Sequence, residues 1–499
     1  MPGRVIIRHS GMSHYLAFDL GAESGRAILG TLQSGRLALE ELHRFPNTPV
    51  RVFSSLYWDT LRLWHEIQQG LRIAGRERQI ALDGIGVDTW GVDFALLGAD
   101  GALVENPRHY RDARNNGMPD EVFKLVPREE VFTHTGIQFM QINTLYQLYA
   151  MRLAGSPALA SARTLLMTPD LFNYWLTGAA KSELTIASTS QFYNPRLKRW
   201  ATELFDRLDL PKAILPEIAQ PGSCLGPLLP QIAEASHLSA VPVYATGSHD
   251  TASAVAAVPA EGDSWCYISS GTWSLMGVEL DAPLIDARSL ALNLTNEMGA
   301  CGKTRLLKNI AGLWLLQECR RAWALAGQEY SYEELTTMAT SAQPFSAVID
   351  PDAFLEPDAM PAKISAHCQA TGQQAQDSPA AIARTIFESL ALRYREVLES
   401  LESLLGRRLS TIHIVGGGSR NRTLNQFVAD ACGRTVIAGP AEATAMGNVL
   451  IQAMGTGELS GLSAIREIVR RSTALETFSP KPAGDWDRAY EKFRVVARR

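Results

Sequence analysis

Three segments of the chain share one pattern of hydrophobic and polar positions. In each, an apolar β-rich run is followed by a polar turn with Gly and then by a second apolar run, which predicts an antiparallel hairpin with a Gly-rich bend. The segments are residues 15–32 (YLAFDLGAESGRAILGTL), 85–101 (IGVDTWGVDFALLGADG) and 265–280 (WCYISSGTWSLMGVEL). Between them, helical periodicity over 58–74 and 141–153 predicts a mixed α/β chain.

The C-terminal part of the chain has a different pattern. The segment TIHIVGGGSRNRTLNQFVADACG predicts a strand, a triple-glycine turn and an amphipathic helix that ends at Gly433. A long helix is predicted before it, at 380–406. Because each half opens with a hairpin, we expect an ancient duplication into two similar lobes. The boundary is expected near residues 258–262, which gives domains 1–257 and 258–499.

Length and composition agree with this division. A chain of 499 residues exceeds what one hydrophobic core usually supports, and small ligands tend to bind in clefts between lobes. With 46% hydrophobic residues, 20% charged residues and a net charge of −5, the chain fits an ordinary globular protein and has no field suited to nucleic acid. The stretch 340–380, rich in Ala, Pro, Gln and Ser, is expected to be a loosely structured surface excursion.

The spacing of the cysteines and the lengths of the apolar runs indicate in which cellular compartment the protein is expected. The six cysteines show no C-x-x-C spacing, so neither a zinc site nor a disulfide framework is indicated, and a reducing cytoplasm is favoured. No run of eighteen apolar residues occurs, so no membrane partner is expected. Met12 stands just before the first strand-like run, so residues 1–11 are expected to be a disordered extension or the result of an upstream start, and we attach no function to them.

The turn in FDLGAESGR has chemistry suited to phosphate. Asp19 ends a strand, the turn 21–25 offers closely spaced backbone amides, and Arg26 adds a positive charge. Amides and a cation suit phosphate oxygens, whereas a carboxylate at a strand end suits a hydrated magnesium ion. The alternative is a plain hairpin turn.

Two further loops have the same character. SSGTWS (269–274) adds hydroxyl donors, and GGGSRN (416–421) joins a strand to a helix N-terminus, where a nucleotide can approach the backbone. The second loop is neither a Walker loop nor a dinucleotide-binding fingerprint. Each loop alone could be a tight turn, but three such loops in one chain favour phosphate binding.

Asp250 stands in a run of small residues, SHDTASA. One interpretation is an N-cap of the Ala-rich helix that follows. The other is a carboxylate that a ligand must approach closely. His249 could orient a ligand or pack as a structural residue, Thr251 could combine a cap with a ligand contact, and Trp90 could stack on the apolar face of a ligand or belong to a core strand.

These motifs occur in an order that resembles the FGGY carbohydrate kinases of the actin-like ATPase superfamily. The matching segments, from about Tyr15 to past Gly447, are DLGAESGR, GVDTWGVDF, YRDAR, MTPDLFNYWLTG, SELTIASTSQFYN, SHDTASA, SSGTWSLMG, LLKNIAGLWLLQ, HIVGGGSRN and PAEATAMGN. The resemblance implies an α/β fold with two RNase H-like (actin-like ATPase) lobes, and ATP and a sugar that meet in the cleft between them.

The resemblance also implies roles for single residues. The residues that would hold the phosphates are Ala22, Glu23, Ser24, Gly25, Arg26 and Thr272, and those that would lie at the nucleotide are Gln317 and Gly417. The residues that would face the ketose are Gly91, His249, Asp250, Thr251 and Asn309. Asp250 would be the catalytic base, and Asp19 would position Mg²⁺ through water. Glu23 stands where relatives commonly have Ser or Thr, and an acid there would repel the nucleotide unless it points outward or toward the metal.

The segments DTWGVDF, NTLYQL and LKNIAGLWLLQ are similar to those of family members that act on L-rhamnulose. The implied function is ATP-dependent formation of L-rhamnulose 1-phosphate in L-rhamnose catabolism, in the cytoplasm, with a ketose and ATP as partners and the oligomeric state open between monomer and dimer. The alternatives are a kinase of L-fuculose or xylulose, and a non-catalytic actin-like ATP-binding switch protein. We also expect lobe closure on binding, with a hinge near 258–262.

Overall fold

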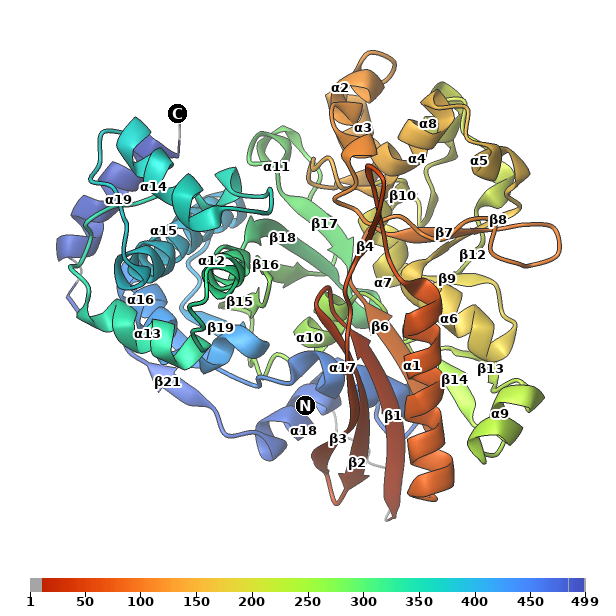
Figure 1. Cartoon of the computed structure of the whole chain (residues 1–499). Coiled ribbons are helices and arrows are strands. Elements are labelled where there is room, and N and C mark those ends of the chain that lie inside the picture. The colour runs from red at the N-terminus through yellow and green to blue at the C-terminus, as the bar shows by residue number, and fades with distance from the viewer. Residues whose placement is uncertain (1–10, 483, 498–499) are drawn as a thin grey trace. The chain divides into compact units, whose positions relative to one another are not determined.

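The computed structural model describes residues 11–482 and 484–497 and divides into two compact units (Figure 1). Unit 1 comprises the residues up to Pro259 together with Glu279–Leu306 and Ala443–Ser472, and unit 2 comprises Ala260–Val278, Leu307–Glu442 and the residues from Thr473 on. Two segments of the second half therefore pack within unit 1, so the units differ from the continuous division expected from the sequence. The expected N-terminal extension lies, apart from Gly11, outside the described residues.

Unit 1 is built around a six-stranded sheet with the order β13-β14-β6-β1-β2-β3. Its strands are β1 (Met12–Leu20), β2 (Ser24–Gln33), β3 (Arg36–Pro46), β4 (Val50–Val52), β5 (Ser55–Tyr57), β6 (Gly84–Thr89), β7 (Phe94–Leu97), β8 (Thr164–Met167), β9 (Lys181–Glu183), β10 (Tyr193–Asn194), β11 (Arg199–Trp200), β12 (Glu217–Ala219), β13 (Cys224–Pro227), β14 (Pro242–Tyr244) and β17 (Thr295–Met298). Its helices are α1 (Thr60–Arg72), α2 (Met118–Phe123), α3 (Arg128–Thr135), α4 (Thr144–Leu153), α5 (Pro157–Ser161), α6 (Thr168–Thr177), α7 (Leu184–Ala187), α8 (Thr202–Arg207), α9 (Pro230–Ser236), α10 (Asp250–Ala256), α11 (Ala287–Ala291), α17 (Ala443–Gly455) and α18 (Leu462–Ser472).

The second large sheet has seven strands in the order β17-β18-β16-β15-β19-β20-β21, and all of them except β17 lie wholly or mainly in unit 2. The strands of unit 2 are β15 (Trp265–Ser270), β16 (Trp273–Leu280), β18 (Thr304–Ala311), β19 (Thr411–Val415), β20 (Thr435–Ala438) and β21 (Glu476–Phe478), and the ends of β16 and β18 extend into unit 1. Its helices are α12 (Trp314–Leu325), α13 (Tyr332–Ser341), α14 (Met360–Ala370), α15 (Pro379–Leu405), α16 (Arg422–Cys432) and α19 (Gly484–Val496).

The two sheets repeat one topology. In unit 1, β1 pairs antiparallel with β2 and parallel with β6, which in turn is parallel to β14. In unit 2, β15 pairs antiparallel with β16 and parallel with β19, which in turn is parallel to β20. Both sheets end on an antiparallel strand, β13 in one and β21 in the other. The expected similarity of the two lobes is confirmed at the level of their sheets.

Two of the three predicted hairpins are confirmed and one is wrong. The segments 15–32 and 265–280 form the hairpins β1–β2 and β15–β16. The segment 85–101 does not form a hairpin, because β6 lies between β1 and β14 and pairs with both, whereas β7 pairs with β8. Every residue of β6 is buried, as is typical of a central parallel strand.

The strand, triple-glycine turn and helix near the C-terminal end are also confirmed. The side chain of Asn421 caps α16 by accepting a hydrogen bond from the amide of Leu424. The helix ends at Gly433, whose φ of 61° is the left-handed conformation that glycine adopts at helix ends. In contrast, the stretch 340–380 is more ordered than expected, because it contains α14 and buries Ile364 and Cys368.

Helices cover the sheet of unit 1 closely on both faces. A Cβ at Gly70 of α1 would lie 2.7 Å from atoms of Phe18 and Ala27, so this helix needs glycine to approach the strands. On α17, a Cβ at Gly447 would lie 1.8 Å from the backbone oxygen of Ser253 in α10. Glycine at this crossing therefore lets α10, which begins at Asp250, pack directly on α17.

Candidate active site

Three segments that are far apart in the chain meet at one edge of the unit 1 sheet. β1 and β6 are parallel and in register, so Asp19 lies opposite Asp88. Thr89, at the end of β6, donates its backbone N–H to the oxygen of Ser248 at 2.9 Å and forms a bridge with His249. Because parallel strands have their carboxyl ends at the same edge of a sheet, Asp19 and Asp250 are brought to one edge.

Asp250 is the first residue of α10, and His249 occupies the N-cap position without a side-chain cap bond. The Asp250 Oδ1 atom accepts hydrogen bonds from the Thr251 backbone N–H at 2.5 Å and from the Thr251 hydroxyl at 3.2 Å. A capping side chain instead accepts from an amide two or three residues further on, so the N-cap interpretation of Asp250 and Thr251 is wrong. The Asp250 side chain keeps 29% of its surface accessible and is therefore enclosed but reachable.

Burial and neighbouring charge act on the carboxylates at this edge. Burial raises the pKa of Asp250, the imidazole of His249 opposes the rise, and the negative charge of Asp19 adds to it. Burial also raises the pKa of Asp88 well above its usual range, and Asp19 adds to this effect. The Asp88 Oδ2 atom accepts a hydrogen bond from Asn448 at 2.5 Å, whereas its Oδ1 atom has no hydrogen-bond partner among the described residues. This edge therefore favours a bound cation.

The turn between β1 and β2 presents its backbone at the surface. The Gly21 amide donates to the Ser24 oxygen at 2.9 Å, and Asn47 binds the other side of the turn through its contacts with Gly21 and Glu23. Glu23 is exposed, which is the orientation required for an acid in a phosphate-binding turn. Gly25 has a packing role, because a Cβ there would lie 2.2 Å from the ring of Phe45. Ala22 and Ser24 are only partly buried and leave this turn accessible.

Two residues predicted for different ligands form an ion pair. Arg26 and Asp19 lie opposite each other in the hairpin, and their Nη2 and Oδ2 atoms are 2.5 Å apart. The sequence assigned Arg26 to phosphate and Asp19 to magnesium. In the structure each neutralises the other, so a phosphate or a cation would have to share or displace the partner.

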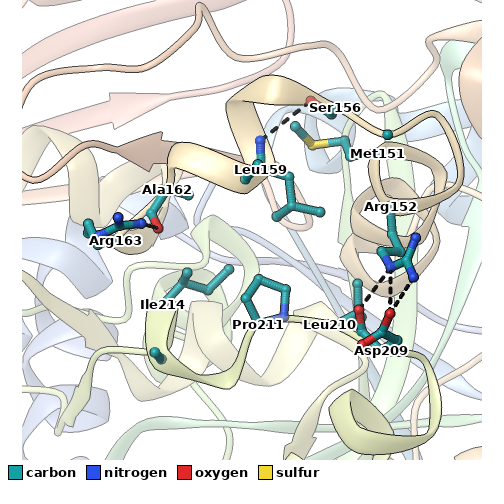
Figure 2. Close-up of a pocket in the computed structure, with 13 residues that line it drawn as sticks. Met151, Arg152, Ser156, Leu159, Ala162, Arg163, Asp209, Leu210, Pro211 and Ile214 are labelled. Atoms are coloured by element: carbon teal, nitrogen blue, oxygen red, sulfur yellow. Dashed lines mark hydrogen bonds and ion pairs between the residues drawn. The ribbon is translucent and has the colours of Figure 1, made fainter.

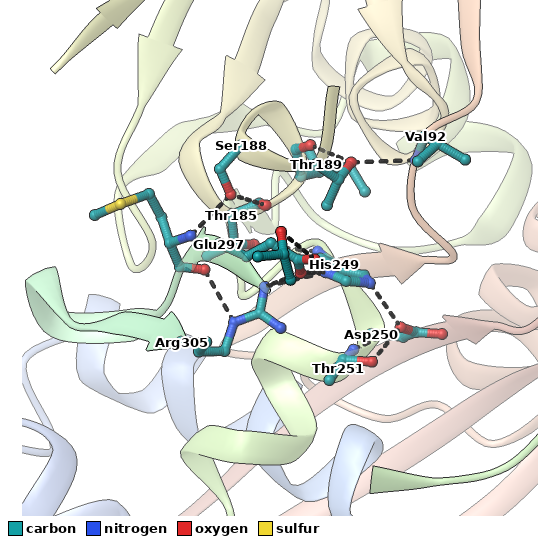
Figure 3. Close-up of polar contacts among 12 residues, drawn as sticks. Val92, Thr185, Ser188, Thr189, His249, Asp250, Thr251, Glu297 and Arg305 are labelled. Carbon is teal, nitrogen blue, oxygen red and sulfur yellow. Dashed lines mark hydrogen bonds and ion pairs between the residues drawn. The ribbon is translucent and has the colours of Figure 1, made fainter. Parts of the chain in front are cut away.

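Of the predicted sugar-facing residues of unit 1, Asp250 and Thr251 lie next to His249 (Figure 3). The backbone N–H of His249 donates to the Thr185 hydroxyl at 3.1 Å, and its Nε2 atom lies 3.4 Å from Asp250 Oδ1. Gly91 follows β6 and remains partly exposed, and a Cβ there would lie 3.3 Å from Thr189. The structure thus places Gly91, His249, Asp250 and Thr251 in unit 1.

Trp90 belongs to the core. It is 6% exposed, its Nε1 atom donates to Asp93 Oδ2 at 2.9 Å, and its ring lies 4.1 Å from that of Trp58, centroid to centroid. The core-strand interpretation therefore describes Trp90 better than stacking on a sugar.

In unit 2, the loop between β15 and β16 docks on the start of α12. The backbone oxygens of Gly271 and Thr272 accept hydrogen bonds from the amides of Leu313 and Trp314 at 3.1 and 3.0 Å. The Gln317 side-chain amide donates to the Thr272 hydroxyl at 3.2 Å, and its Oε1 atom has no hydrogen-bond partner among the described residues. Thr272 and Gln317, both predicted for the nucleotide, are thus in direct contact.

The triple-glycine turn lies beside this loop, since β15 and β19 are parallel neighbours. Gly416 has a φ of 82°, and a Cβ at Gly418 would lie 2.0 Å from the hydroxyl oxygen of Ser270, so both glycines are required by the fold. Gly417 is exposed, and a Cβ there would meet no atom within 4 Å. The protein itself has room for a side chain at Gly417, so a need for glycine there would come from a ligand.

Asn309, predicted to face the ketose, lies on β18 in unit 2 and is partly buried. The other predicted ketose residues lie in unit 1. Lys308 immediately precedes Asn309 in the chain. Its pKa is lowered to about 8, mainly by burial and also by the charge of Arg393. The contact of Asn309 with the ketose stays a prediction.

Several residues at the site were not identified from the sequence. Asp88, Glu297 and Arg305 are buried charged residues that lie near Asp19, Asp250 or His249. The available signal was an acid or a base inside an apolar strand pattern, as in GIGVDT and TRLLKNIA. Such residues are expensive to bury unless they are paired, but the sequence does not show their partners.

A pocket of about 580 Å³ lies elsewhere in unit 1 (Figure 2). Its wall includes Met151, Leu159 and Ile214, together with Arg152, which is paired with Asp209. No residue predicted for the nucleotide, ketose or metal lines it. This pocket is therefore separate from the candidate active site.

Metal ligation by the protein alone is not favoured. Among residues 11–482 and 484–497, no group of three or more His, Cys, Asp or Glu side chains is arranged to hold a metal ion. Magnesium, however, retains several waters and often uses one or two carboxylates together with substrate phosphates. The acidic edge formed by Asp19 and Asp88 fits that mode. In the same described part of the chain, no helix is long and apolar enough to cross a membrane.

Comparisons with known proteins agree with this geometry. Models of the FGGY family of carbohydrate kinases match the chain, the N-terminal domain at residues 14–257 and the C-terminal domain at 266–456. A Bacteroides thetaiotaomicron protein named rhamnulokinase is 47% identical over 488 residues, which cover 97% of this chain and 99% of that protein. A rhamnulokinase of Oceanobacillus iheyensis is 39% identical over 466 residues, covering 93% of this chain and 98% of that protein.

Solved structures show the same fold at low identity. A gluconate kinase from Lactobacillus acidophilus superposes with a TM-score of 0.81 at 15% identity, covering 98% of each chain. A Plasmodium falciparum glycerol kinase with ADP superposes with a TM-score of 0.76 at 15% identity, covering 98% of this chain and 97% of that one. The expected α/β fold is confirmed, and the chain belongs to the FGGY family of carbohydrate kinases.

Proposed function

We propose that the chain transfers the γ-phosphoryl group of ATP to L-rhamnulose, forming L-rhamnulose 1-phosphate and ADP in L-rhamnose catabolism. The observation that carries the proposal is Asp250, a carboxylate that is enclosed by protein, remains 29% accessible and stands beside His249. The relatives that are 39% and 47% identical are both named rhamnulokinase, which supports L-rhamnulose as the substrate.

Asp250 would act as the general base. As the C1 hydroxyl oxygen of the ketose forms a bond to the γ-phosphorus, its proton passes to the Asp250 carboxylate, and the bond from phosphorus to the bridging oxygen breaks to release ADP. The raised pKa of Asp250 brings this base closer to neutral pH, where proton acceptance is most effective. Phosphoryl transfer otherwise requires alignment and charge neutralisation more than covalent chemistry by the protein.

We also propose which residues would hold the nucleotide. The residues proposed to bind the phosphates are Ala22, Glu23, Ser24, Gly25 and Arg26, with Thr272, and those at the rest of the nucleotide are Gln317 and Gly417. At residues 22–24 the contribution would come from backbone amides, because Glu23 is exposed and acidic. Mg²⁺, positioned by Asp19 through water, would neutralise phosphate charge.

The ketose would be bound by Gly91, His249, Asp250, Thr251 and Asn309. His249 and Thr251 contact the Asp250 carboxylate, so the three side chains would offer the sugar a polar surface with hydrogen-bonding groups in unit 1. A site that hydrogen-bonds substrate hydroxyls rejects analogues that lack them, so discrimination among ketoses is expected to rest on these residues. The enzyme is proposed to work in the cytoplasm, where ATP is available, as a monomer or a dimer.

The proposal is tested by a coupled ADP-release assay with L-rhamnulose, L-fuculose, D-xylulose, L-xylulose, L-ribulose and glycerol. We expect the highest kcat/KM with L-rhamnulose. A higher value with L-fuculose or a xylulose would assign the chain to another ketose kinase of the family. ATP hydrolysis at the same rate with and without every ketose would instead support a switch protein.

A further inference from the structure

A buried polar cluster lies next to Asp250, the candidate base, in unit 1. It consists of His249, Glu297 on β17 and Arg305 near the start of β18, and we call it the His249 cluster (Figure 3). The side chains are 8%, 5% and 0% exposed, respectively. Two charged groups without access to water are costly, so their arrangement calls for a reason beyond stability.

The three side chains meet at the Nδ1 atom of the imidazole. The Arg305 Nη2 atom lies 3.1 Å from His249 Nδ1 and 3.1 Å from Glu297 Oε2. The Glu297 Oε2 atom lies 3.2 Å from the same Nδ1 atom. The opposite nitrogen of the ring, Nε2, faces Asp250 Oδ1 at 3.4 Å. The ring thus connects the buried ion pair on one side with the proposed base on the other.

A carboxylate lies near each ring nitrogen, Glu297 at Nδ1 and Asp250 at Nε2, but only Nδ1 also has a guanidinium 3.1 Å away, and this contact favours one tautomer. A carboxylate oxygen only accepts hydrogen bonds, so Nε2 must carry a proton to interact favourably with Asp250. In a neutral ring Nδ1 is then an acceptor, and a guanidinium, which only donates, is its fitting partner. Glu297 then has the separate task of neutralising Arg305.

The supports of the cluster are themselves fixed. Arg305 Nε donates to the backbone oxygen of Met298 at 3.1 Å, and the Met298 amide donates to the Ser188 hydroxyl at 2.9 Å. On the other side, the His249 amide is held by Thr185. The guanidinium and the imidazole therefore both have fixed positions, which is what a preorganised site requires.

We propose that Arg305, with its charge balanced by Glu297, is a positioning residue that donates to His249 Nδ1 and so holds Nε2–H toward Asp250 and the ketose. The ring then serves as a fixed donor to the sugar and keeps the carboxylate aligned for proton acceptance. This role rests on the proposed function, because it assigns the ketose as the group that His249 meets. Arg305 and Glu297 would act through His249 and are not assigned a contact with the ketose.

The tautomer is tested directly by NMR of the full-length protein labelled with ¹⁵N-histidine. A His249→Asn variant assigns the signal of His249 among the ten histidines. We expect the neutral ring with its proton on Nε2. A proton on Nδ1, whether alone or together with Nε2, would overturn the proposal. In Arg305→Met, Glu297 is left as the partner of Nδ1, so the proton is expected to move to Nδ1.

Kinetics provide the second test, with Arg305→Met, Arg305→Lys and Glu297→Gln. We expect kcat/KM for the ketose to fall by about tenfold or more in Arg305→Met, while KM for ATP stays within about twofold. Arg305→Lys should retain part of the activity because it keeps a charged donor. The matched control is Arg466→Met, which removes another little-exposed arginine of unit 1, paired with Glu279.

The control separates positioning from folding. If Arg305→Met and Arg466→Met lower the melting temperature alike and neither changes the ketose kinetics, the positioning role is wrong. If the wild-type protein does not phosphorylate L-rhamnulose, the proposed function fails in the kinetic assay. The NMR measurement still decides the tautomer in that case, because it needs no substrate.

Discussion

Replacing Asp250 with Asn removes the proposed base while preserving the shape of the side chain. Asn can still accept the hydrogen bond that Thr251 donates from its amide. General base catalysis contributes about 10²–10⁴ in rate, so turnover should fall by this factor, which corresponds to about 3–5 kcal/mol of activation free energy. KM for the ketose should change little, because most of the binding contacts remain.

Stability is expected to move in the opposite direction. An acid whose pKa is raised by folding binds its proton more tightly in the folded state, so its ionised form costs stability as pH rises above the unfolded pKa. Asp250→Asn removes that cost. The melting temperature at pH 8 should therefore equal or exceed that of the wild type, and the difference should shrink as pH falls toward about 4.

The assay is coupled ADP release with L-rhamnulose, run alongside thermal unfolding at both pH values. Asp350→Asn is a matched control, because burial also raises the pKa of Asp350, which caps a short helix that Asn can cap equally well. The control should keep turnover within about twofold of the wild type. Turnover of Asp250→Asn within about threefold of the wild type would refute the assignment of Asp250 as the base.

Three further predictions follow from the same geometry. Gly417→Val should fold normally, since a Cβ there meets only open space, and it should raise KM for ATP by about tenfold, because the side chain would occupy space proposed for the nucleotide. Gly418→Val should instead destabilise the fold, because its side chain would collide with Ser270. A change confined to the KM of the ketose in Gly417→Val would contradict the nucleotide assignment. Burial raises the pKa of Glu183 from 4.5 to about 7, so at about 1.4 kcal/mol per unit the folded protein should lose up to about 3 kcal/mol as pH rises through this range. Urea unfolding should accordingly show a larger loss of stability for Glu183→Gln at pH 5 than at pH 8, and an equal loss at both would speak against the shift. Finally, small-angle scattering should show a smaller radius of gyration when ketose and a non-hydrolysable ATP analogue are both bound, and an unchanged radius with both sites occupied would exclude closure.

Local pattern was sufficient where the partners of an element are neighbours in the chain. The hairpins β1–β2 and β15–β16 were predictable because strand, turn and strand are consecutive. The segment 85–101 shows the limit of this reasoning. Its first run pairs with β1 and β14, which lie far away in sequence, and an apolar run does not specify which strand it will pair with.

The candidate site divides in the same way. The sequence by itself indicated Asp250 and His249, because small neighbours leave a carboxylate accessible, and it indicated the three glycine-containing loops, because each loop is one continuous stretch of the chain. Only the tertiary structure placed Asp88 opposite Asp19 and brought Arg305 and Glu297 to His249. The physical reason is that the role of a buried charge depends on its partner, and such partners are brought together by strand order and helix packing rather than by the local sequence.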